Sequence, residues 1–391
     1  MNVIYFVDDE QSVLDGLRRM LRDLRKEWRM EFFTCARKAL AAMQNVPPDV
    51  VVSDMRMPGM DGVELLAQVQ KRYPSGIRMV LSGHAEFDAI SRVMSSAHQV
   101  MSKPCEAEHL RAVLKNAGIL CRQLVDPSLA KAIAGLGSLP SIPTVLQELI
   151  DTLQRSEVDQ RVVAAMIERD PALSVRVLQV ANSGFFASRT RIDSISQAVV
   201  MLGAEMLKNL VIQVKIVEAF PSTNSSFSLE QFSGRLALIT KLARAIAPPH
   251  VRVDDVRNLA MTADVGQMVL AARLPDRYEA VLQECQLRQR SIVAIEEELL
   301  GANHASVGAY LMGLWGMDPA IVTQIGQHHT PLGSGENEPL LVAVHMAECL
   351  VDSDGNEERL HELLQPGLLD AFERRDDVPG WLEQVAAALV R

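Results

Sequence analysis

The stretch Val50-Val51-Val52-Ser53-Asp54 is an apolar run that stops abruptly at a carboxylate. A second run of this kind covers residues 3–7 and stops at Asp8. Uninterrupted apolar runs of this length are typical of strands that are buried on both faces, as in parallel sheets. We therefore predict two parallel strands, each of which carries an aspartate at its carboxyl end.

Two further apolar runs, at residues 79–81 and 98–102, are followed by Ser82 and Lys103 respectively. Between the runs, apolar residues recur at the spacing of a helix. These helical segments are residues 13–24 and 62–73. Strands that alternate with helices predict a doubly wound α/β sheet.

The polar residues at the strand ends form one predicted site. Ligands of open α/β sheets bind beyond the carboxyl ends of the strands. Five side chains are expected to converge there: Asp8, Asp9, Asp54, Ser82 and Lys103. Neighbouring carboxylates repel each other unless a cation joins them, and hard oxygen ligands favour Mg²⁺. We predict that Asp54 is a carboxylate nucleophile that forms an acyl phosphate. Lys103 would pair with the added charge, and the Ser82 hydroxyl would donate to a phosphoryl oxygen.

The joint pattern resembles the receiver domain of two-component response regulators. Its motifs are D-D-E at residues 8–10, S-D-M-R-M-P-G-M-D-G at 53–62, L-S-G at 81–83 and S-K-P at 102–104. The resemblance covers roughly residues 1–122 and implies a flavodoxin-like sheet of five parallel strands. It also implies that Mg²⁺ is held by Asp8, Asp9, Asp54 and the backbone carbonyl of Arg56. A partner histidine kinase would supply the phosphoryl group.

One position departs from the receiver pattern. Val100 stands three residues before Lys103, where an aromatic residue is common in the family. The aromatic switch of the family is then weakened, while movement of the Ser82 hydroxyl remains available. Taken singly, the motifs have simpler explanations, because an Asp-Asp pair can cap a helix and Lys-Pro can mark a turn. A receiver that is no longer phosphorylated is a further alternative.

The composition favours a cytoplasmic regulator over a nucleic-acid-binding or membrane protein. The 391 residues include 39 Lys and Arg against 49 Asp and Glu. Nucleic-acid-binding domains usually carry a basic patch, but the densest basic cluster, residues 18–29, is interrupted by Asp23 and Glu27. The five scattered cysteines contain no C-x-x-C pair and are typical of reduced thiols. No signal pattern is present, and no apolar run reaches the roughly 18 residues of a membrane span.

The remainder of the chain has helical periodicity. Gly, Pro and Ser are concentrated at residues 135–143, which is typical of a connector. We predict a linker over residues 123–138, an all-helical domain over residues 139–332 and a helical C-terminal extension over residues 333–391.

Local signals place several helices in this domain. Asp170-Pro171 predicts a helix start, with Asp as the cap and Pro at the first position. The stretch Ser194-Ile195-Ser196-Gln197 fits a capping box before an apolar run. Two further core helices are predicted, at residues 236–247 and 256–272.

The helical half resembles the HDOD family, which is similar to HD-type phosphohydrolases and has often lost the catalytic metal site. The resembling segments begin with L-P-S-I-P-T-V-L-Q-E-L at residues 139–149 and I-E-R-D-P-A-L-S-V-R-V-L-Q-V-A-N-S-G-F-F at 167–186. They continue with I-S-Q-A-V-V-M-L-G at 195–203, G-A-N-H-A-S-V-G-A-Y-L at 301–311 and H-H-T-P at 328–331. The resemblance covers roughly residues 135–332.

The resemblance raises the question of a metal site, because HD-type enzymes hold divalent ions that activate a bound water. Ala263 stands where those enzymes have the His of a central His-Asp pair, and Arg235 stands at another ligand position. A guanidinium cannot ligate a cation. The late Asp position corresponds to Glu348. The remaining candidates are Asp264, His304, His328 and His329. They form either a residual metal site or a set of residues satisfied by hydrogen bonds; we favour the second and expect no metal in this domain.

These observations give one leading hypothesis and two alternatives. The leading hypothesis is a response regulator in which phosphorylation of Asp54 alters a non-catalytic HDOD domain, through dimerisation or binding of a downstream protein. The first alternative is a divergent metal-dependent phosphohydrolase, acting on a nucleotide messenger and controlled by the receiver. The second is a DNA-binding regulator that uses a helical turn near residues 195–210, which the acidic composition disfavours.

Overall fold

The computed structural model describes most of the chain. The described residues are 2–82, 96–103, 159–182, 192–203, 227–288, 290–315, 319–335, 338–371 and 375–389, with residues 207 and 317 and short pieces within 107–115 and 148–153. The chain forms two compact units, the first built on a sheet and the second on helices. The predicted linker, residues 123–138, lies outside the described residues.

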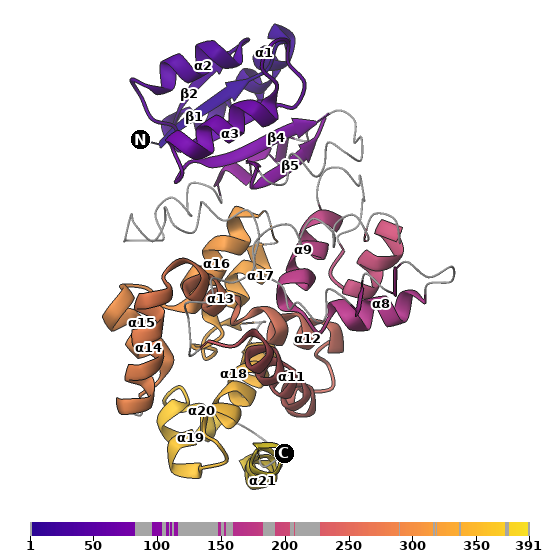
Figure 1. The fold of residues 1–391 in the computed structure, drawn as a ribbon, viewed down its shortest axis with the longest axis vertical. Coiled ribbons are helices and arrows are strands. Elements are labelled where there is room, and N and C mark those ends of the chain that lie inside the picture. The colour runs from indigo at the N-terminus through magenta and orange to yellow at the C-terminus, as the bar shows by residue number, and fades with distance from the viewer. Residues whose placement is uncertain are drawn as a thin grey trace. The chain divides into compact units, whose positions relative to one another are not determined.

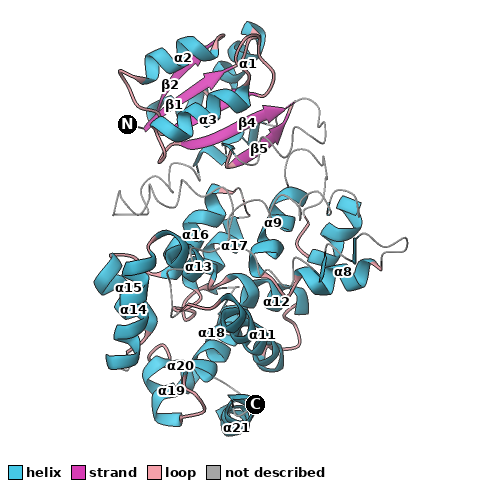
Figure 2. Ribbon diagram, viewed as in Figure 1, coloured by secondary structure: helices cyan, strands magenta, loops and turns pink. Residues whose placement is uncertain are grey.

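The first unit is built on a five-stranded parallel sheet (Figures 1 and 2). In sheet order the strands are β2 (Trp28–Phe33), β1 (Asn2–Val7), β3 (Val50–Asp54), β4 (Ile77–Ser82) and β5 (Gln99–Ser102). Ile4 pairs with Val50, and every residue of β3 is buried. The strand order reverses direction between β1 and β3, so the ligand-binding edge of the sheet is expected there. The predicted doubly wound sheet is confirmed.

Helices flank the sheet. They are α1 (Gln11–Met20), the 3₁₀ helix η1 (Arg22–Lys26), α2 (Ala36–Met43) and α3 (Gly62–Arg72). The Asp61 carboxylate caps α3 by accepting a hydrogen bond from the Glu64 N–H at 2.7 Å. This cap fixes the start of α3 directly after the loop that follows Asp54, so the loop is held at the carboxyl edge of the sheet.

The second unit contains no strand among its described residues. Its helices are α8 (Gln160–Ile167), α9 (Pro171–Ala181), α11 (Leu229–Ile246), α12 (Val253–Thr262), α13 (Val265–Arg273), α14 (Pro275–Arg288), α15 (Ile292–Leu300), α16 (His304–Leu314), α17 (Pro319–Gln327), α18 (Glu338–Asp352), α19 (Glu357–Leu363), α20 (Leu368–Ala371) and α21 (Val378–Leu389), with the 3₁₀ helix η3 (Arg375–Asp377). The predicted all-helical class is confirmed.

Helix α18 is the centre of this unit. Nearly all of its residues between Leu340 and Val351 are buried, and it packs along α11. A helix that is apolar on all sides needs neighbours all round. The sequence places α18 in the C-terminal extension, yet it forms part of the core of the helical unit.

Two predicted helix starts are present. The Asp170 carboxylate accepts hydrogen bonds from the N–H groups of Ala172 and Leu173, and the Ser194 hydroxyl accepts one from the Gln197 N–H at 3.2 Å. One prediction was wrong. The helix expected over residues 256–272 is two helices, α12 and α13, because the backbone of Asp264 leaves the helical conformation at φ −88°, ψ 5°.

Candidate functional site

Two buried aspartates meet at the carboxyl edge of the sheet. Asp8 follows β1 and is 2% exposed, while Asp54 ends β3 and is 8% exposed. Lys103 follows β5, and its Nζ atom lies 2.6 Å from Asp8 Oδ2. The same ammonium also forms an ion pair with Asp54 Oδ1. One cation therefore joins two carboxylates that would otherwise repel each other.

The orientations of both carboxylates are fixed by the backbone. The second oxygen of Asp54 accepts a hydrogen bond from the Arg56 N–H at 2.8 Å, and Asp8 Oδ1 accepts one from the Glu10 N–H at 3.0 Å. Burial alone would lower the pKa of Lys103, but its hydrogen bonds to Asp54 and Asp8 outweigh burial and hold that pKa above its usual value. The ammonium therefore stays charged at neutral pH.

The other predicted residues of this site lie around the same edge. Asp9 is exposed beside Asp8, and the side chain of Arg56 is exposed. Ser82 is the last residue of β4 and pairs with Ser102 of β5. The structure thus brings Asp8, Asp54 and Lys103 into contact and puts Asp9, Arg56 and Ser82 next to them in the fold.

The carboxylates at this edge of the sheet are suitable ligands for a magnesium ion. The site contains three carboxylates, those of Asp8, Asp9 and Asp54. The ammonium of Lys103 neutralises only part of their charge. The remaining negative charge and the oxygen donors suit Mg²⁺, which binds through one or two carboxylates and keeps several waters. Gly62 lets the start of α3 approach the backbone of Asp54 closely, because a Cβ atom there would overlap the carbonyl oxygen of Asp54.

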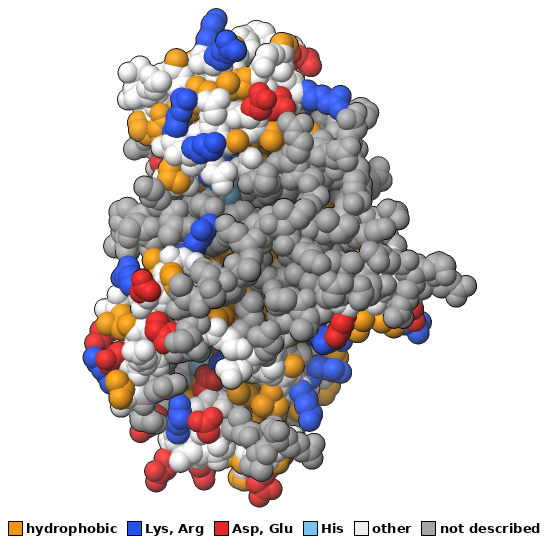
Figure 3. Space-filling view, in the orientation of Figure 1, with side chains coloured by type: hydrophobic (Ala, Val, Ile, Leu, Met, Phe, Trp, Pro, Cys, Tyr) orange, Lys and Arg blue, Asp and Glu red, His pale blue; other side chains and the backbone are white. Residues whose placement is uncertain are grey.

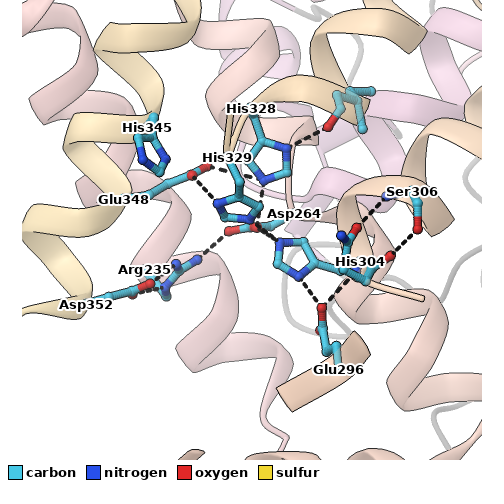
Figure 4. Close-up of polar contacts among 12 residues, drawn as sticks. Arg235, Asp264, Glu296, His304, Ser306, His328, His329, His345, Glu348 and Asp352 are labelled. Atoms are coloured by element: carbon cyan, nitrogen blue, oxygen red, sulfur yellow. Dashed lines mark hydrogen bonds and ion pairs between the residues drawn. The ribbon is translucent and has the colours of Figure 1, made fainter. Parts of the chain in front are cut away.

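A second cluster of polar side chains is buried in the helical unit (Figure 4). Asp264 precedes α13, His304 begins α16, and His328 and His329 follow α17. The nitrogen and oxygen atoms that these four residues offer lie within 4.8 Å of one another. His304 lies at the centre, with Nε2 2.9 Å from Asp264 Oδ1 and Nδ1 2.7 Å from Glu296 Oε2.

Arg235 of α11 reaches the same aspartate. Its guanidinium forms an ion pair with Asp264 and a bidentate pair with Asp352, in which both N···O distances are 2.9 Å. Ala263, beside Asp264, is fully buried and offers no donor atom. Burial alone would raise the pKa of Asp264, but Arg235 and His304 hold that pKa well below its usual value. Asp264 therefore already carries two cationic partners.

These contacts and the burial of the cluster shift the pKa values of His304, His329 and Glu348. Burial alone would lower the pKa of His304, but Glu296 and Asp264 outweigh it and raise that pKa to about 10. His304 is thus an imidazolium that donates from Nδ1 to Glu296 and whose Nε2 lies 2.8 Å from His329 Nε2. Burial and two neighbouring histidines hold the pKa of His329 well below its usual value, and burial raises the pKa of Glu348 well above its usual value.

Sequence reasoning missed three members of this cluster. Glu296 is paired with His304, Asp352 with Arg235, and His345 lies beside His329 with a ring-centroid distance of 5.8 Å. Glu296 belongs to a run of three glutamates, which hides the one buried acid among two solvated ones. Asp352 lies in an acidic stretch that sequence alone places in a loop. An acidic residue in an otherwise apolar helix is the signal that could have found Glu296.

Comparisons with known families cover both units. The model of the response regulator receiver domain matches residues 4–115, and the model of the HDOD domain matches residues 139–331. This chain is a response regulator with an HDOD domain. The two-domain organisation expected from the motifs is thereby confirmed, while the exact boundaries at residues 122, 138 and 332 stay predictions.

Curated relatives match part of the chain. The hydrogenase transcriptional regulatory protein HoxA of Cupriavidus necator is 34% identical over 116 residues, 29% of this chain and 23% of that protein. The DNA-binding transcriptional regulator NtrC of Proteus hauseri is 28% identical over 161 residues, 40% of this chain and 33% of that protein. The response regulator thus spans a third or less of the length of these two curated relatives.

Two solved structures share the fold over most of the chain. The MmoQ response regulator of Methylococcus capsulatus matches with a TM-score of 0.50 at 19% identity, covering 63% of this chain and 98% of that chain. A virulence factor of Campylobacter jejuni matches with a TM-score of 0.51 at 18% identity, covering 68% and 98%. Among the described helices of the response regulator, none combines the length and apolar character needed to cross a membrane.

Proposed function

We propose that this response regulator accepts a phosphoryl group on Asp54 from a histidine kinase and transmits the event to a non-catalytic HDOD domain. The contact of the Lys103 ammonium with both Asp8 and Asp54 carries this proposal. It supports the proposal because a carboxylate and a cation lie together at the carboxyl edge of an open α/β sheet, where ligands of such folds bind.

The roles of the individual side chains follow from their positions. An Asp54 carboxylate oxygen attacks the phosphorus, and the kinase histidine leaves with the electrons of the broken P–N bond. Lys103, already held at Asp54 Oδ1, pairs with a phosphoryl oxygen. The Ser82 hydroxyl donates to another. Mg²⁺, held by Asp8, Asp9, Asp54 and the Arg56 carbonyl, supplies charge neutralisation when bound.

The proposal of a non-catalytic HDOD domain is supported by the side chains around Asp264. A catalytic metal would require His304 as a free donor, but His304 pairs with Glu296 and its pKa is raised to about 10. The Arg235 guanidinium holds one oxygen of Asp264, whose other oxygen, Oδ1, has no hydrogen-bond partner in the described chain. Ala263 offers no lone pair in the place of a ligand. We propose that this buried network holds the helices of the domain together.

Output is proposed to proceed through self-assembly or through binding of a downstream protein. On the face of the helical unit drawn in Figure 3, basic and acidic side chains are interspersed over the described surface, and no basic stripe is visible there. Phosphate contacts of nucleic-acid-binding proteins come from clustered Lys and Arg side chains. This surface therefore favours a protein partner over DNA.

The acceptor is tested by incubating the full chain with acetyl phosphate and Mg²⁺ and recording the intact mass. We expect one added phosphoryl group in the wild type and none in Asp54→Asn, because the amide is a poor nucleophile. Phosphorylation of both proteins to the same extent would refute the assignment of Asp54.

The output is tested by light scattering with and without Mg²⁺ and beryllium fluoride. Assembly predicts a change of solution mass in the wild type and none in Asp54→Asn. An unchanged mass, with binding of beryllium fluoride confirmed separately, excludes assembly and leaves capture of a downstream protein as the output.

The alternative of a metal-dependent hydrolase is tested by elemental analysis of the full chain purified without chelators. We expect transition metal far below one ion per chain. A stoichiometric ion that is lost in His304→Ala and His329→Ala, together with phosphohydrolase activity, would contradict a non-catalytic HDOD domain.

A further inference from the structure

We propose that a cavity of the HDOD domain, separate from the phosphorylation site, binds a small organic anion that has an apolar body. The cavity has a volume of about 750 Å³ and is lined by residues of α11, α14, α18 and α19 and of the segment between α14 and α15. Binding sites for drug-sized molecules have volumes of about 300–1,000 Å³. The cavity therefore has room for one such molecule.

Three arginines from three parts of the fold line this cavity: Arg235, Arg290 and Arg359. Two carboxylates, Asp352 and Asp354, also line it. The lining itself thus has one more guanidinium than it has carboxylates. Because these guanidinium groups also pair with Asp264 and Glu298 outside the lining, an anion would bind through their remaining N–H groups and not through a net positive charge.

The arginines have hydrogen-bonding capacity left. A guanidinium has five N–H donors. The ion pairs of Arg290 with Glu298 and of Arg359 with Asp354 each engage one terminal nitrogen. The side chain of Arg290 is 47% exposed and that of Arg359 is 36% exposed. Each can contact an anion in the cavity without giving up its carboxylate partner.

Gln267 of α13 gives an independent indication of a ligand. Its side chain lines the cavity, is only 6% exposed and makes no hydrogen bond with any residue of the described chain. Neither amide atom is among the fully buried side-chain atoms that lack a partner, so the amide is open to the solvent of the cavity. An anionic group or a polar edge of a ligand would satisfy the donor of this amide.

The remaining lining is apolar. Leu238, Leu282, Ile292 and Leu363 contribute to it. Apolar walls with a few polar groups that fix the orientation of the ligand are typical of small-molecule sites. The combination of arginines, one unpartnered amide and leucine side chains defines the ligand class as a carboxylate, sulfonate or phosphate attached to an apolar body. This inference does not depend on phosphorylation of Asp54.

The test uses two fluorescent probes with the full chain. Anilinonaphthalene sulfonate has an apolar body and one anionic group, and phenylnaphthylamine is its neutral counterpart. We expect saturable binding of the sulfonate at one site and binding of the neutral probe that is weaker by about tenfold or more. Equal affinities for the two probes, or no saturable binding of the sulfonate, would overturn the proposal.

A variant that fills the cavity tests whether the sulfonate probe binds there. Gly234 lies inside α11 and lines the cavity, and a Cβ atom there would meet nothing within 4 Å. Gly234→Phe fills the cavity without a backbone clash and should weaken sulfonate binding by about tenfold or more. The matched control is Gly380→Phe in α21, where a Cβ atom also meets nothing within 4 Å; it should leave binding unchanged.

A second variant tests the anion contact without filling the cavity. Arg359→Gln should weaken the sulfonate by about tenfold and leave the neutral probe within about twofold of the wild type. Sulfonate affinities of Gly234→Phe or Arg359→Gln that equal the wild-type value, with folding confirmed by thermal melting, would show that the probe binds elsewhere and would refute the site.

Discussion

Arg235 neutralises a carboxylate that has almost no access to water. Its partner Asp264 has a side chain that is 1% exposed, and Asp352 holds the other face of the guanidinium. Removing one partner of a buried ion pair leaves an uncompensated charge, which is far more costly than the loss of an exposed pair. Arg235 thus has a structural role in the helical unit.

We expect Arg235→Ala to lower the free energy of unfolding by about 3 kcal/mol, since Asp264 is left buried and without its cation. Urea denaturation of the full chain, followed by circular dichroism, measures this loss. The matched control is Arg252→Ala, because Arg252 is 58% exposed and pairs with Asp193 at the surface. It should cost far less than Arg235→Ala, because the pair is exposed to solvent; equal losses in the two variants would contradict the structural role of Arg235.

His304 makes the stability of the domain depend on pH, and the direction of this dependence follows from its pKa. Its pKa is raised from 6.5 to about 10 in the fold. A group with a raised pKa contributes stability that is fully present below its unfolded pKa and is lost as the pH rises through its folded pKa. The groups that face it are Asp264, Glu296, His328 and His329.

We therefore expect the difference in unfolding free energy between the wild type and His304→Gln to be largest at about pH 6.5 and to shrink towards pH 10. Urea titrations of both proteins across this range measure the difference, and titrating groups that do not contact His304 cancel in the subtraction. A difference that is constant with pH would mean that His304 is neutral in the fold.

Some of these residue-scale features were accessible from sequence and some were not. Asp8, Asp54 and Lys103 each follow an apolar run, so strand topology alone predicts their meeting at one edge. The pairing of Glu296 with His304 and of Asp352 with Arg235 depends on how helices pack, which local periodicity does not encode. The sequence therefore left open whether Asp264, His304, His328 and His329 bind a metal or each other.

At the scale of elements, close approach between α13 and α16 depends on one glycine. A Cβ atom at Gly266 would overlap the backbone carbonyl of His304. The same approach places Asp264, at the start of α13, beside His304, at the start of α16. The break between α12 and α13 therefore lies at Asp264, the residue that contacts His304 in the buried network.

We expect Gly266→Ala to destabilise the helical unit by about 1–3 kcal/mol, because the added methyl group forces the two helices apart. Gly234→Ala is the matched control, since it also lies inside a helix but has open space around its Cβ atom. That change should raise stability by up to about 1 kcal/mol through helix propensity. Thermal melting of both variants measures these changes in stability. A loss of stability of similar size in both variants would refute the packing argument.

Prediction of the strands succeeded for β1, β3, β4 and the edge strand β5, and it failed for β2, the strand at the other edge. The runs that became β1, β3 and β4 are uniformly apolar and were located from sequence. β2 was not, because its sequence Trp28-Arg29-Met30-Glu31-Phe32-Phe33 mixes charged and apolar residues, as befits an edge strand. The helical periodicity of residues 256–272 is continuous, and only the tertiary contacts of Asp264 explain the break.

At the scale of the whole molecule, the chain joins a receiver to an HDOD domain, and the account requires the two to be coupled. Conversion of the Asp54 carboxylate to an acyl phosphate replaces a charge of −1 by a charge of about −2, so the edge of the sheet gains about one negative charge. Such a local change has a distant effect only if it biases an element with two arrangements. The sequence identifies the two domains but contains no pattern that predicts how their states are linked.

Hydrogen–deuterium exchange of the full chain, with and without Mg²⁺ and beryllium fluoride, tests this coupling most directly. The account predicts altered exchange in peptides from residues 139–331 as well as from residues 4–115 in the wild type, and no alteration in Asp54→Asn. Exchange that changes in the wild type only within residues 4–115 would contradict transmission of the phosphorylation signal to the HDOD domain.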